Sequence, residues 1–325
     1  MSEHTLPSPT LQEFQSWPSE KVEPIARGKT VVLASGGSSR WYFLEHGDTR
    51  KGYTATEQFR DYGRRGLQRI VEQASMMLDD GISTVFAPGF AGGQGERNPE
   101  YVENLKWAYQ VLINEDAQAL YEQHRLGVLF RGSWQPLFDR LDAPDLSERY
   151  EAVEAQTKAR SERWLVWFVA EDFIPESLLP TVTQSLVETG KMPERVALSE
   201  QYYGRPLDIV DIFISNNKFN VAGMVPPLLR LNDLYFTVSP SFYMDRLQWR
   251  NILYDHIFAR RGHYRDYTKL TPEAVEDMRE FYRVNRGVTM GVGAYHEPSQ
   301  TWRPTPFPVQ RESRTTHEQT ATSQK

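Results

Sequence analysis

Six short apolar runs, rich in β-branched and aromatic residues, recur along the chain and are separated by helix-length or longer segments. They span Thr30 to Ala34, Thr84 to Ala87, Leu126 to Phe130, Trp164 to Val169, Ile209 to Ile214 and Leu234 to Val238. Strands that alternate with helical segments are typical of βα units. The pattern therefore predicts an α/β fold with a central, mainly parallel sheet of about six strands, flanked by helices.

Three of the connecting segments have the composition or spacing of helices. Apolar residues from Phe59 to Leu78 recur mostly three and four positions apart, which predicts an amphipathic helix that Gly81 would end. A second helix has a clear start, because Asn98 can cap it and Pro99 suits the first helical position. The stretch from Asp145 to Arg163 is highly charged, so we expect an exposed helix that extends toward a partner subunit.

The composition indicates a globular protein with a small ligand. The chain has 325 residues, 39% of them hydrophobic, a formal net charge of -6 and no cysteine. The hydrophobic content suffices for a substantial core, and the lack of cysteine excludes disulfides, a thiol nucleophile and cysteine-ligated zinc. The acidic balance argues against nucleic-acid binding. No apolar run approaches the roughly 20 residues of a membrane span, so we expect a cytoplasmic protein with no stable membrane insertion.

The two ends of the chain differ in composition from the middle. We expect residues 1–24 to be a flexible N-terminal segment and residues 25–297 to form one domain. Residues 298–325 are rich in Pro, Thr, Gln and Ser. Such polar segments cannot bury enough apolar surface to fold, so this tail is predicted to be disordered.

Two of the predicted strands run into residues suited to holding an anion. The first strand leads into Gly36, Gly37, Ser38, Ser39, Arg40 and Trp41, and the fifth leads into Asn216 and Lys218. In open α/β sheets ligands bind beyond the carboxyl ends of the strands, where small residues let backbone N–H groups approach phosphate oxygens. Either junction alone could be an ordinary turn. Two such junctions in one sheet favour a single phosphate site.

Other enzyme signatures are incomplete. Gly93-Gln94-Gly95 lacks the last glycine of a dinucleotide-binding motif, and no Walker lysine follows it. This glycine-rich stretch reads instead as a mobile loop over the carboxyl edge of the sheet. The seven histidines never take the spacing of a metal motif, and no G-x-S-x-G nucleophile elbow is present. Asp79 and Asp80, just before Gly81, are interpreted as a solvated helix end.

Aromatic residues are numerous near the predicted loop edge. They are Tyr62, Phe90, Tyr101, Trp107, Tyr202, Tyr203, Phe219, Tyr235, Phe242 and Tyr243. The core is the ordinary place for such rings. Rings that faced a pocket would suit an apolar ligand and could stabilise a carbocation through their negative faces. An anion site beside an aromatic cavity is the layout that a prenyl diphosphate requires.

Several longer stretches carry a resemblance to a known family. They run from Leu234 to Met244, from Ile252 to Ile257 and from Gly291 to Gly293. With the junctions above, these stretches resemble the (Z)-prenyl-chain transferase, or cis-prenyltransferase, superfamily, and within it the branch of diterpene synthases. The likeness covers about residues 25–297. It implies an undecaprenyl diphosphate synthase-like fold, a diphosphate site at the carboxyl edge of the sheet, and a homodimer.

The resemblance assigns roles by position and also marks departures. Arg40 and Trp41 match the pair that closes the family's first phosphate loop, and Tyr62 and Tyr101 match two pocket tyrosines of the diterpene-synthase branch. Lys218 stands where that branch has arginine, which keeps the charge but not the planar fork. Ser39 stands where the close relatives have a further arginine.

The largest departure concerns the metal. Gly36 takes the place of the aspartate that the family uses with Mg²⁺ and diphosphate. We expect Mg²⁺ to be carried in with the diphosphate and to keep several waters, with Glu45, Asp48 or Asp61 as alternative ligands. The metal ligands therefore stay unassigned.

The resemblance implies a diterpene synthase that ionises a bicyclic C20 allylic diphosphate of the kolavenyl or halimadienyl (tuberculosinyl) type and quenches the cation with water. The implied catalytic residues are Arg40, Tyr62, Tyr101 and Lys218. The implied substrate-binding residues are Gly36, Gly37, Ser38, Ser39, Trp41, Phe90, Asn216 and Phe219. Two alternatives stay open. One is transfer of the allylic group to a nucleoside or to isopentenyl diphosphate. The other is a non-catalytic accessory subunit of a cis-prenyltransferase.

Overall fold

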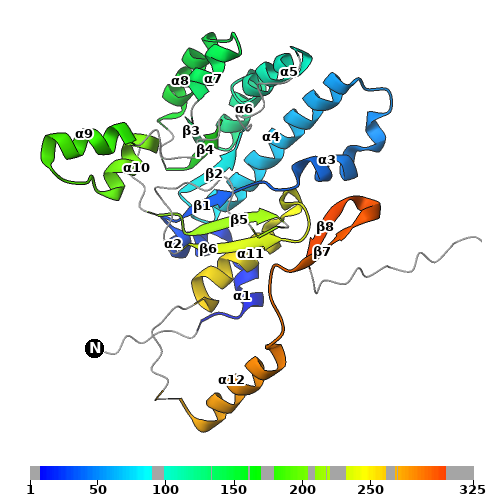
Figure 1. Ribbon diagram of the computed structural model, residues 1–325, viewed down its shortest axis with the longest axis vertical. Coiled ribbons are helices and arrows are strands. Elements are labelled where there is room, and N and C mark those ends of the chain that lie inside the picture. Colours follow the sequence, from blue (N-terminus) through cyan, green and yellow to red (C-terminus); the bar gives the residue numbers. More distant parts are fainter. Residues whose placement is uncertain are drawn as a thin grey trace, which may run out of the picture. The chain divides into compact units, whose positions relative to one another are not determined.

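A six-stranded sheet, parallel throughout, forms the centre of the computed structural model (Figure 1). The structure describes residues 8–89, 99–132, 134–159, 162–169, 179–203, 209–216, 218–219, 232–260, 268 and 270–304. The strands are β1 (Thr30–Leu33), β2 (Thr84–Pro88), β3 (Gly127–Arg131), β4 (Trp164–Phe168), β5 (Ile212–Asn216) and β6 (Asp233–Thr237). They lie in the order β3-β4-β2-β1-β5-β6. All six predicted strands and the predicted α/β class are confirmed.

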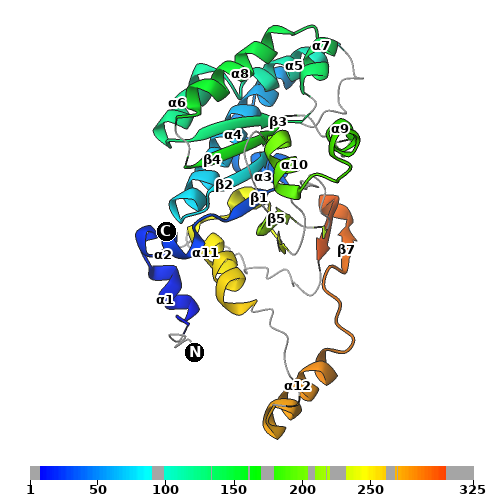
Figure 2. The same ribbon diagram turned by 90° about the vertical axis from the view of Figure 1, so that its left-hand side faces the viewer.

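Helices connect the first five strands along the chain, as a parallel sheet requires, whereas most of the segment between β5 and β6 lies outside the described residues. The α-helices in the described residues before 266 are α1 (Leu11–Ser16), α2 (Ser19–Ala26), α3 (Ser38–His46), α4 (Ala55–Asp79), α5 (Pro99–Gln110), α6 (Glu115–Gln123), α7 (Trp134–Arg140), α8 (Asp145–Thr157), α9 (Leu179–Thr189), α10 (Arg195–Tyr203) and α11 (Arg246–Tyr254). Helices α1 and α2 precede β1, and α11 follows β6. Figures 1 and 2 show α5 to α8 gathered on one side of β3 and β4.

The core occupies both faces of the sheet, because successive strand residues point to opposite sides. In β1, Val31 and Leu33 join the larger hydrophobic cluster, whereas Val32 joins the smaller one. The larger cluster also takes in the apolar stripe of α4 and residues from α5 to α8. The side of the sheet that α4 covers is therefore the thicker part of the core.

Helix α4 follows the predicted pattern closely. It begins with a capping box, in which the Thr54 side chain accepts from the backbone of Glu57 and the Glu57 side chain accepts from the backbone of Thr54. It ends two residues before Gly81, whose φ of +103° lies in the region that favours glycine. Helix α5 begins at Pro99, as predicted, whereas Asn98 lies outside the described residues.

The charged stretch after residue 144 forms the predicted helix, but the expectation that this helix is exposed was wrong for one of its faces. Helix α8 packs against β3 and buries Leu146, Tyr150, Val153 and Thr157. The hydroxyl of Tyr150 donates to the backbone oxygen of Tyr109 at 2.8 Å. The four buried positions lie four, three and four residues apart, which is the stripe of an amphipathic helix. A count of charges along the stretch overlooks this stripe.

The start of the chain is folded from residue 10 onward, contrary to the expectation for residues 1–24. Helices α1 and α2 are present, and Phe14 in α1 is fully buried. They are anchored by Arg250, which donates from Nη1 to the backbone oxygens of Phe14 at 3.3 Å and Trp17 at 3.1 Å. Residues 1–7 lie outside the described part of the chain.

Asp80 was also misjudged, because it is fully buried and not solvated. Its carboxylate accepts from Arg250 Nε at 2.5 Å and Nη2 at 2.6 Å, and from Trp249 Nε1 at 3.0 Å. Ser19 Oγ and Arg246 Nη1 complete the shell at 2.7 and 3.1 Å. The end of α4 is thereby tied to α2 and α11. Both Asp79 and Asp80 were expected to be exposed to solvent, but only Asp79 is.

The chain divides into two compact units, residues 1–265 and 266–325, so the boundary lies before the position 297 that the sequence suggested. The second unit contains α12 (Pro272–Asn285) and an antiparallel pair, β7 (Gly293–His296) and β8 (Thr301–Pro304). Residues 298–304, which were expected to be disordered, therefore include a strand, and residues 305–325 lie outside the described part. No helix in the described residues has both the length and the apolar character needed to cross a bilayer.

Candidate active site

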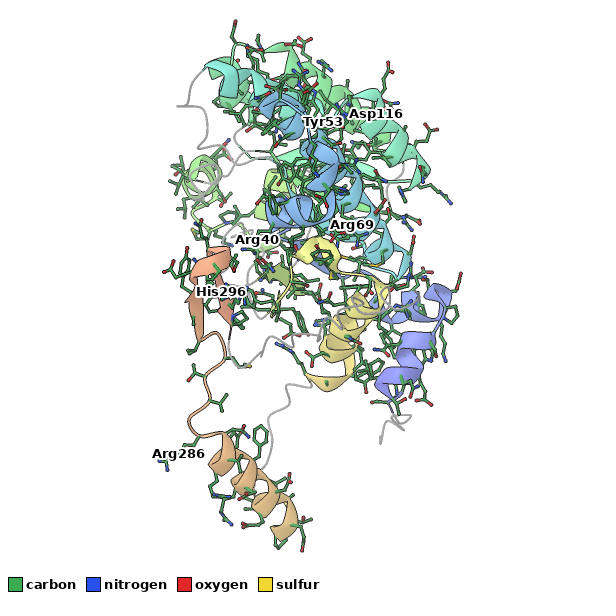
Figure 3. All side chains as sticks on the ribbon, turned by 90° about the vertical axis from the view of Figure 1, so that its right-hand side faces the viewer. Arg40, Tyr53, Arg69, Asp116, Arg286 and His296 are labelled. Atoms are coloured by element: carbon green, nitrogen blue, oxygen red, sulfur yellow. The ribbon has the colours of Figure 1, made fainter. Side chains whose placement is uncertain are left out.

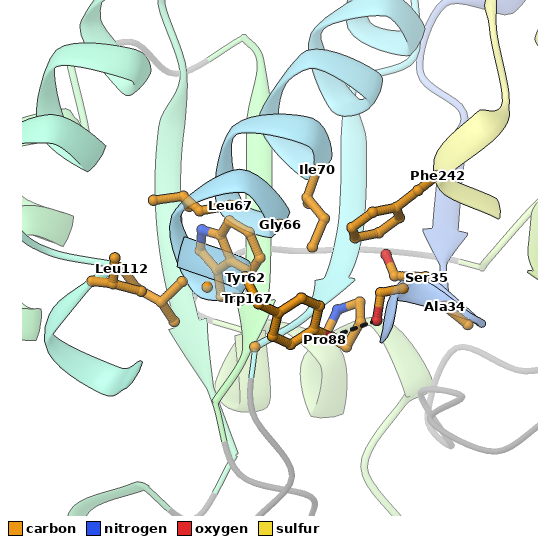
Figure 4. Close-up of a pocket in the computed structure, with 14 residues that line it drawn as sticks. Ala34, Ser35, Tyr62, Gly66, Leu67, Ile70, Pro88, Leu112, Trp167 and Phe242 are labelled. Atoms are coloured by element: carbon orange, nitrogen blue, oxygen red, sulfur yellow. Dashed lines mark hydrogen bonds between the residues drawn. The ribbon is translucent and has the colours of Figure 1, made fainter. Parts of the chain in front are cut away.

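A cavity of about 260 Å³ lies at the carboxyl ends of the central strands, between the sheet and α4 (Figure 4). It is lined by Ala34, Ser35, Ser38, Tyr62, Gly63, Gly66, Leu67, Ile70, Pro88, Gly89, Val111, Leu112, Trp167 and Phe242. Most of these residues are apolar, and the hydroxyl groups among them are those of Ser35, Ser38 and Tyr62. The cavity is therefore suited to a hydrocarbon group whose polar end points toward the loop after β1.

Two glycines lie in the part of α4 that lines this cavity, and they have different roles. A Cβ on Gly63 would lie 2.7 Å from Trp107 Cζ3, so Gly63 permits the close packing of α5 against α4. A Cβ on Gly66 would meet only Phe242, at 3.8 Å. Glycine in a helix costs about 1 kcal/mol relative to alanine. At position 66 no packing contact requires glycine. The missing side chain there keeps the cavity open.

A pair of hydroxyl groups stands at the polar end of the cavity. Ser38 Oγ and Tyr62 Oη are 2.7 Å apart, and the dashed line in Figure 4 marks this bond. Burial raises the pKa of Tyr62 above its ordinary value, although the bond to Ser38 acts in the opposite direction. Tyr62 is therefore a neutral hydroxyl at physiological pH, able to donate and accept a hydrogen bond but not to act as a strong base.

The loop after β1 leads directly into the N-terminus of α3. Gly37 is the N-cap with φ +78°, and the Gly37 oxygen accepts from the backbone N–H of Trp41 at 3.0 Å. The first N–H groups of a helix have no intrahelical acceptor, and the helix dipole adds positive potential there. Ser38, Ser39 and Arg40 form this first turn. The predicted phosphate loop thus has the geometry of an anion-binding helix start.

The structure brings the two predicted anion-binding junctions together. Arg40 Nη2 donates to Asn216 Oδ1 at 2.6 Å, which links the turn after β1 to the end of β5. Asn216 is 7% exposed and donates from Nδ2 to the backbone oxygens of Thr237 and Ser239. The amide therefore has fixed partners on both sides. Arg40, labelled in Figure 3, is consequently held in one place at the edge of the sheet.

The other predicted residues are less closely tied to the cavity. Lys218 and Phe219 follow β5 and are exposed, and the Phe219 ring lies 4.6 Å from that of Phe236. Trp41 packs edge-on against Phe242, with ring centroids 5.1 Å apart, and so supports the cavity wall from outside. Tyr101 lies within α5, but its side chain is outside the described residues. Phe90 lies outside them altogether.

The sequence analysis missed most of the cavity wall. Gly66, Ile70 and Trp167 gave no signal of a ligand role, although two glycines on the apolar stripe of a predicted helix would have been a usable one. Phe242 was noted as one aromatic among many. Its place is set by Arg69, labelled in Figure 3, which donates to the backbone oxygens of Phe242 at 2.7 Å and Met244 at 3.1 Å.

The residues at this site do not fit a metal ion held by the protein. A Cβ at Gly36 would lie 2.7 Å from Asn216 Cβ, so the position where the resembled family carries aspartate has no room for a side chain. Asp61 already accepts from Tyr42 at 2.8 Å and from Arg65 at 2.9 Å, and Glu45 accepts from Tyr243. Within the described part of the chain, no three carboxylate or imidazole groups gather as a metal site.

These features define a class of fold. The chain has the cis-prenyltransferase fold: a parallel six-stranded sheet flanked by helices, with the candidate site at its carboxyl edge. Among solved structures, lavandulyl diphosphate synthase from Lavandula x intermedia, in complex with dimethylallyl diphosphate, matches with a TM-score of 0.53. That likeness covers 76% of this chain and 100% of the solved chain at 14% identity.

Curated relatives give a closer likeness. The chain is 29% identical to tuberculosinyl adenosine transferase of Mycobacterium tuberculosis over 88% of its own length and 96% of that protein. It is 26% identical to (+)-kolavelool synthase of Herpetosiphon aurantiacus over 94% of its own length and 99% of that protein. No protein-family model matches the chain. The resemblance to the diterpene-synthase branch is thereby confirmed.

Proposed function

We propose that this protein is a diterpene synthase that acts on a bicyclic C20 allylic diphosphate of the kolavenyl or halimadienyl type. The observation that carries the proposal is an apolar cavity whose polar end holds the Ser38–Tyr62 pair, in which Ser38 begins the same first turn of α3 that carries Arg40. We call Arg40, Asn216, Gly36 and Gly37 the anion seat. The two curated relatives are diterpene-related enzymes by name, and this supports an enzyme of prenyl diphosphate metabolism. The products would be a diterpene alcohol and diphosphate.

The reaction needs charge stabilisation at two places. When the allylic C–O bond breaks, its electron pair goes to the diphosphate oxygen, and fixed donors aimed at that oxygen lower the barrier. Arg40 and the N–H groups of the first turn of α3 are such donors. Lys218 would add a second positive charge from the β5 side. The sequence led us to expect Mg²⁺ carried with the diphosphate, and no step here depends on that ion.

The cation would then be captured by water at the polar end of the cavity. The water oxygen forms the new C–O bond, and its proton passes to solvent or to the departing diphosphate. Tyr62, neutral and fixed by Ser38, is placed to orient this water through a hydrogen bond. The apolar wall around Ile70 and Phe242 keeps other water away from the cation. Tyr101 is the second tyrosine proposed for this task.

A second candidate reaction is transfer of the same allylic group to a nucleoside. The similarity to a tuberculosinyl adenosine transferase favours it specifically. The ionisation step would be unchanged, and an acceptor nitrogen would replace water as the nucleophile. Transfer to isopentenyl diphosphate and a non-catalytic accessory role are the other outcomes that the test must separate. A cytoplasmic homodimer remains our expectation for the assembly.

The test is an incubation of the purified protein with geranylgeranyl, kolavenyl and halimadienyl diphosphates, each alone, with adenosine and with isopentenyl diphosphate. Extracts are examined by gas chromatography with mass spectrometry, and the aqueous phase for a prenylated nucleoside. We expect a C20 alcohol from one bicyclic substrate, and a loss of product in Arg40→Ala and Lys218→Ala. Product only with adenosine would establish the transferase. Binding of a C20 diphosphate without any product would overturn both reactions and support the accessory subunit.

A further inference from the structure

Gly36 and Asn216 share a space that cannot hold two side chains. A Cβ on Gly36 would lie 2.7 Å from Asn216 Cβ, 3.1 Å from its backbone N and 3.4 Å from its Cα. None of these atoms is the far end of a flexible side chain, so the backbone itself would have to move. The Gly36 backbone is fixed as well, because its oxygen accepts from Ser241 N at 3.0 Å and Ser241 Oγ at 3.1 Å.

Position 37 likewise has no room for a side chain. A Cβ on Gly37 would lie 2.9 Å from Arg40 Nη2 and 2.9 Å from Asn216 Oδ1, and the φ of +78° also disfavours other residues. The Arg40–Asn216 hydrogen bond thus lies directly over Gly37, and Gly36 lies against the Cβ and backbone of Asn216. Two adjacent residues without side chains are what allow a guanidinium group to rest against this part of the backbone.

We propose that Arg40, oriented by Asn216 over Gly36 and Gly37, binds the diphosphate of the substrate without Mg²⁺. In the anion seat the positive charge of a fixed arginine replaces that of a metal ion held by carboxylates. The inference rests on the proposed function, since it concerns the leaving group of that reaction.

The chemistry of the side chains supports this exchange. A guanidinium group carries five N–H donors in a planar fork that matches phosphate oxygens, and the bond to Asn216 uses one of them. Asn216 Oδ1 already accepts a bond from Arg40, so a metal ion at this oxygen would lie beside the positive guanidinium group, which disfavours it. The nearby carboxylates Asp61 and Glu45 are engaged with other side chains. The anion seat therefore offers a fixed positive charge, and within the described part of the chain no three carboxylate or imidazole groups gather there to hold a metal ion.

The experiment measures binding of inorganic diphosphate by isothermal titration calorimetry, in EDTA and in MgCl2, alongside a titration with MgCl2 alone. We expect Kd values in the two buffers that agree within about threefold, and no heat from Mg²⁺ alone. Arg40→Ala should weaken binding roughly tenfold or more, as loss of a charge-assisted hydrogen bond does. Asn216→Ala should weaken it less, because the guanidinium remains but is no longer oriented. Arg27→Ala removes an exposed arginine in another part of the chain and is the matched control.

Two further variants test the shared space. Gly36→Asp should lose diphosphate binding in both buffers, because the new side chain forces the backbone of β5 away and adds a negative charge beside Arg40. Gly36→Asp combined with Asn216→Gly relieves the closest clash and should make binding depend on Mg²⁺. Circular dichroism spectra establish that both variants are folded.

The outcomes separate this inference from the proposed function. Diphosphate binding by the unaltered protein only in MgCl2 overturns the inference and leaves the proposed diterpene synthase intact. A full affinity in Arg40→Ala also overturns it. No binding in either buffer overturns the inference and removes the leaving-group site of the proposed function as well. Turnover of a bicyclic diphosphate is measured separately and does not enter this comparison.

Discussion

Replacing Asp80 by asparagine should destabilise the fold far more than the same change at its neighbour Asp79. Asp80 is fully buried and faces Arg250, which is 1% exposed. Asparagine keeps the size of the side chain but removes the negative charge that balances this guanidinium. Asp79 is 43% exposed, and its ion pair with Arg163 spans 2.8 Å at the surface. The two adjacent positions therefore differ mainly in burial.

The magnitude follows from the environment of the two carboxylates. Removing one partner of a buried ion pair leaves an uncompensated charge and costs about 3–5 kcal/mol. Asp80 accepts five hydrogen-bond contacts, two of them from Arg250, so we expect a value in this range for Asp80→Asn. An exposed pair contributes about 0–1 kcal/mol, which sets the expectation for Asp79→Asn. Folded domains are stable by about 5–15 kcal/mol, so the Asp80 variant should still fold.

The assay is urea unfolding followed by tryptophan fluorescence and by circular dichroism, whose transitions must coincide for a two-state analysis. Since Arg250 also holds α1, hydrogen exchange should accelerate at residues 11–26 in Asp80→Asn but not in Asp79→Asn. If Asp80→Asn does not fold, Asp80→Leu with Arg250→Met removes both charges and should recover stability. Equal losses in Asp79→Asn and Asp80→Asn would refute the reasoning, because burial would then not decide the cost.

Three further results are expected. Gly66→Leu should fill the cavity and so lower kcat/KM for a C20 substrate roughly 10- to 100-fold, with no loss in the free energy of unfolding. Gly63→Ala should lower the free energy of unfolding, because the new methyl group would clash with the Trp107 ring. Tyr62→Phe should lower kcat about tenfold through loss of one hydrogen bond, without moving the pH profile below pH 9. Burial raises the pKa values of Tyr121 and Tyr150, so above about pH 10 the unfolded state loses protons that the folded state keeps. The free energy of unfolding should then fall as pH rises, by up to about 1.4 kcal/mol per group and pH unit in a urea titration series.

The sheet could be predicted from the sequence because its signal is local. Each strand is a short apolar run, and the order of elements along the chain is enough to imply parallel pairing. The mistakes came where a residue's role depends on distant partners. Asp80 looks solvated beside Asp79 and Gly81, and only Arg250, 170 residues later, explains its burial. The stripe on α8 was present in the sequence but hidden among more numerous charges.

The site shows the same limit at finer scale. That Arg40 and Asn216 lie close together could be predicted, because the carboxyl ends of parallel strands meet at one edge of a sheet. The sequence could not show that position 36 has no room for an aspartate. A glycine needed for the conformation of a turn and a glycine needed because a neighbouring strand lies too close look the same in the local sequence. The distance of 2.7 Å from the position 36 Cβ to Asn216 decides between these readings. From the sequence, Gly36 is interpreted as the loss of a metal-binding aspartate. In the structure, glycine at position 36 makes room for Asn216, and Asn216 orients Arg40. The role of Gly36 can therefore be judged only together with that of Asn216.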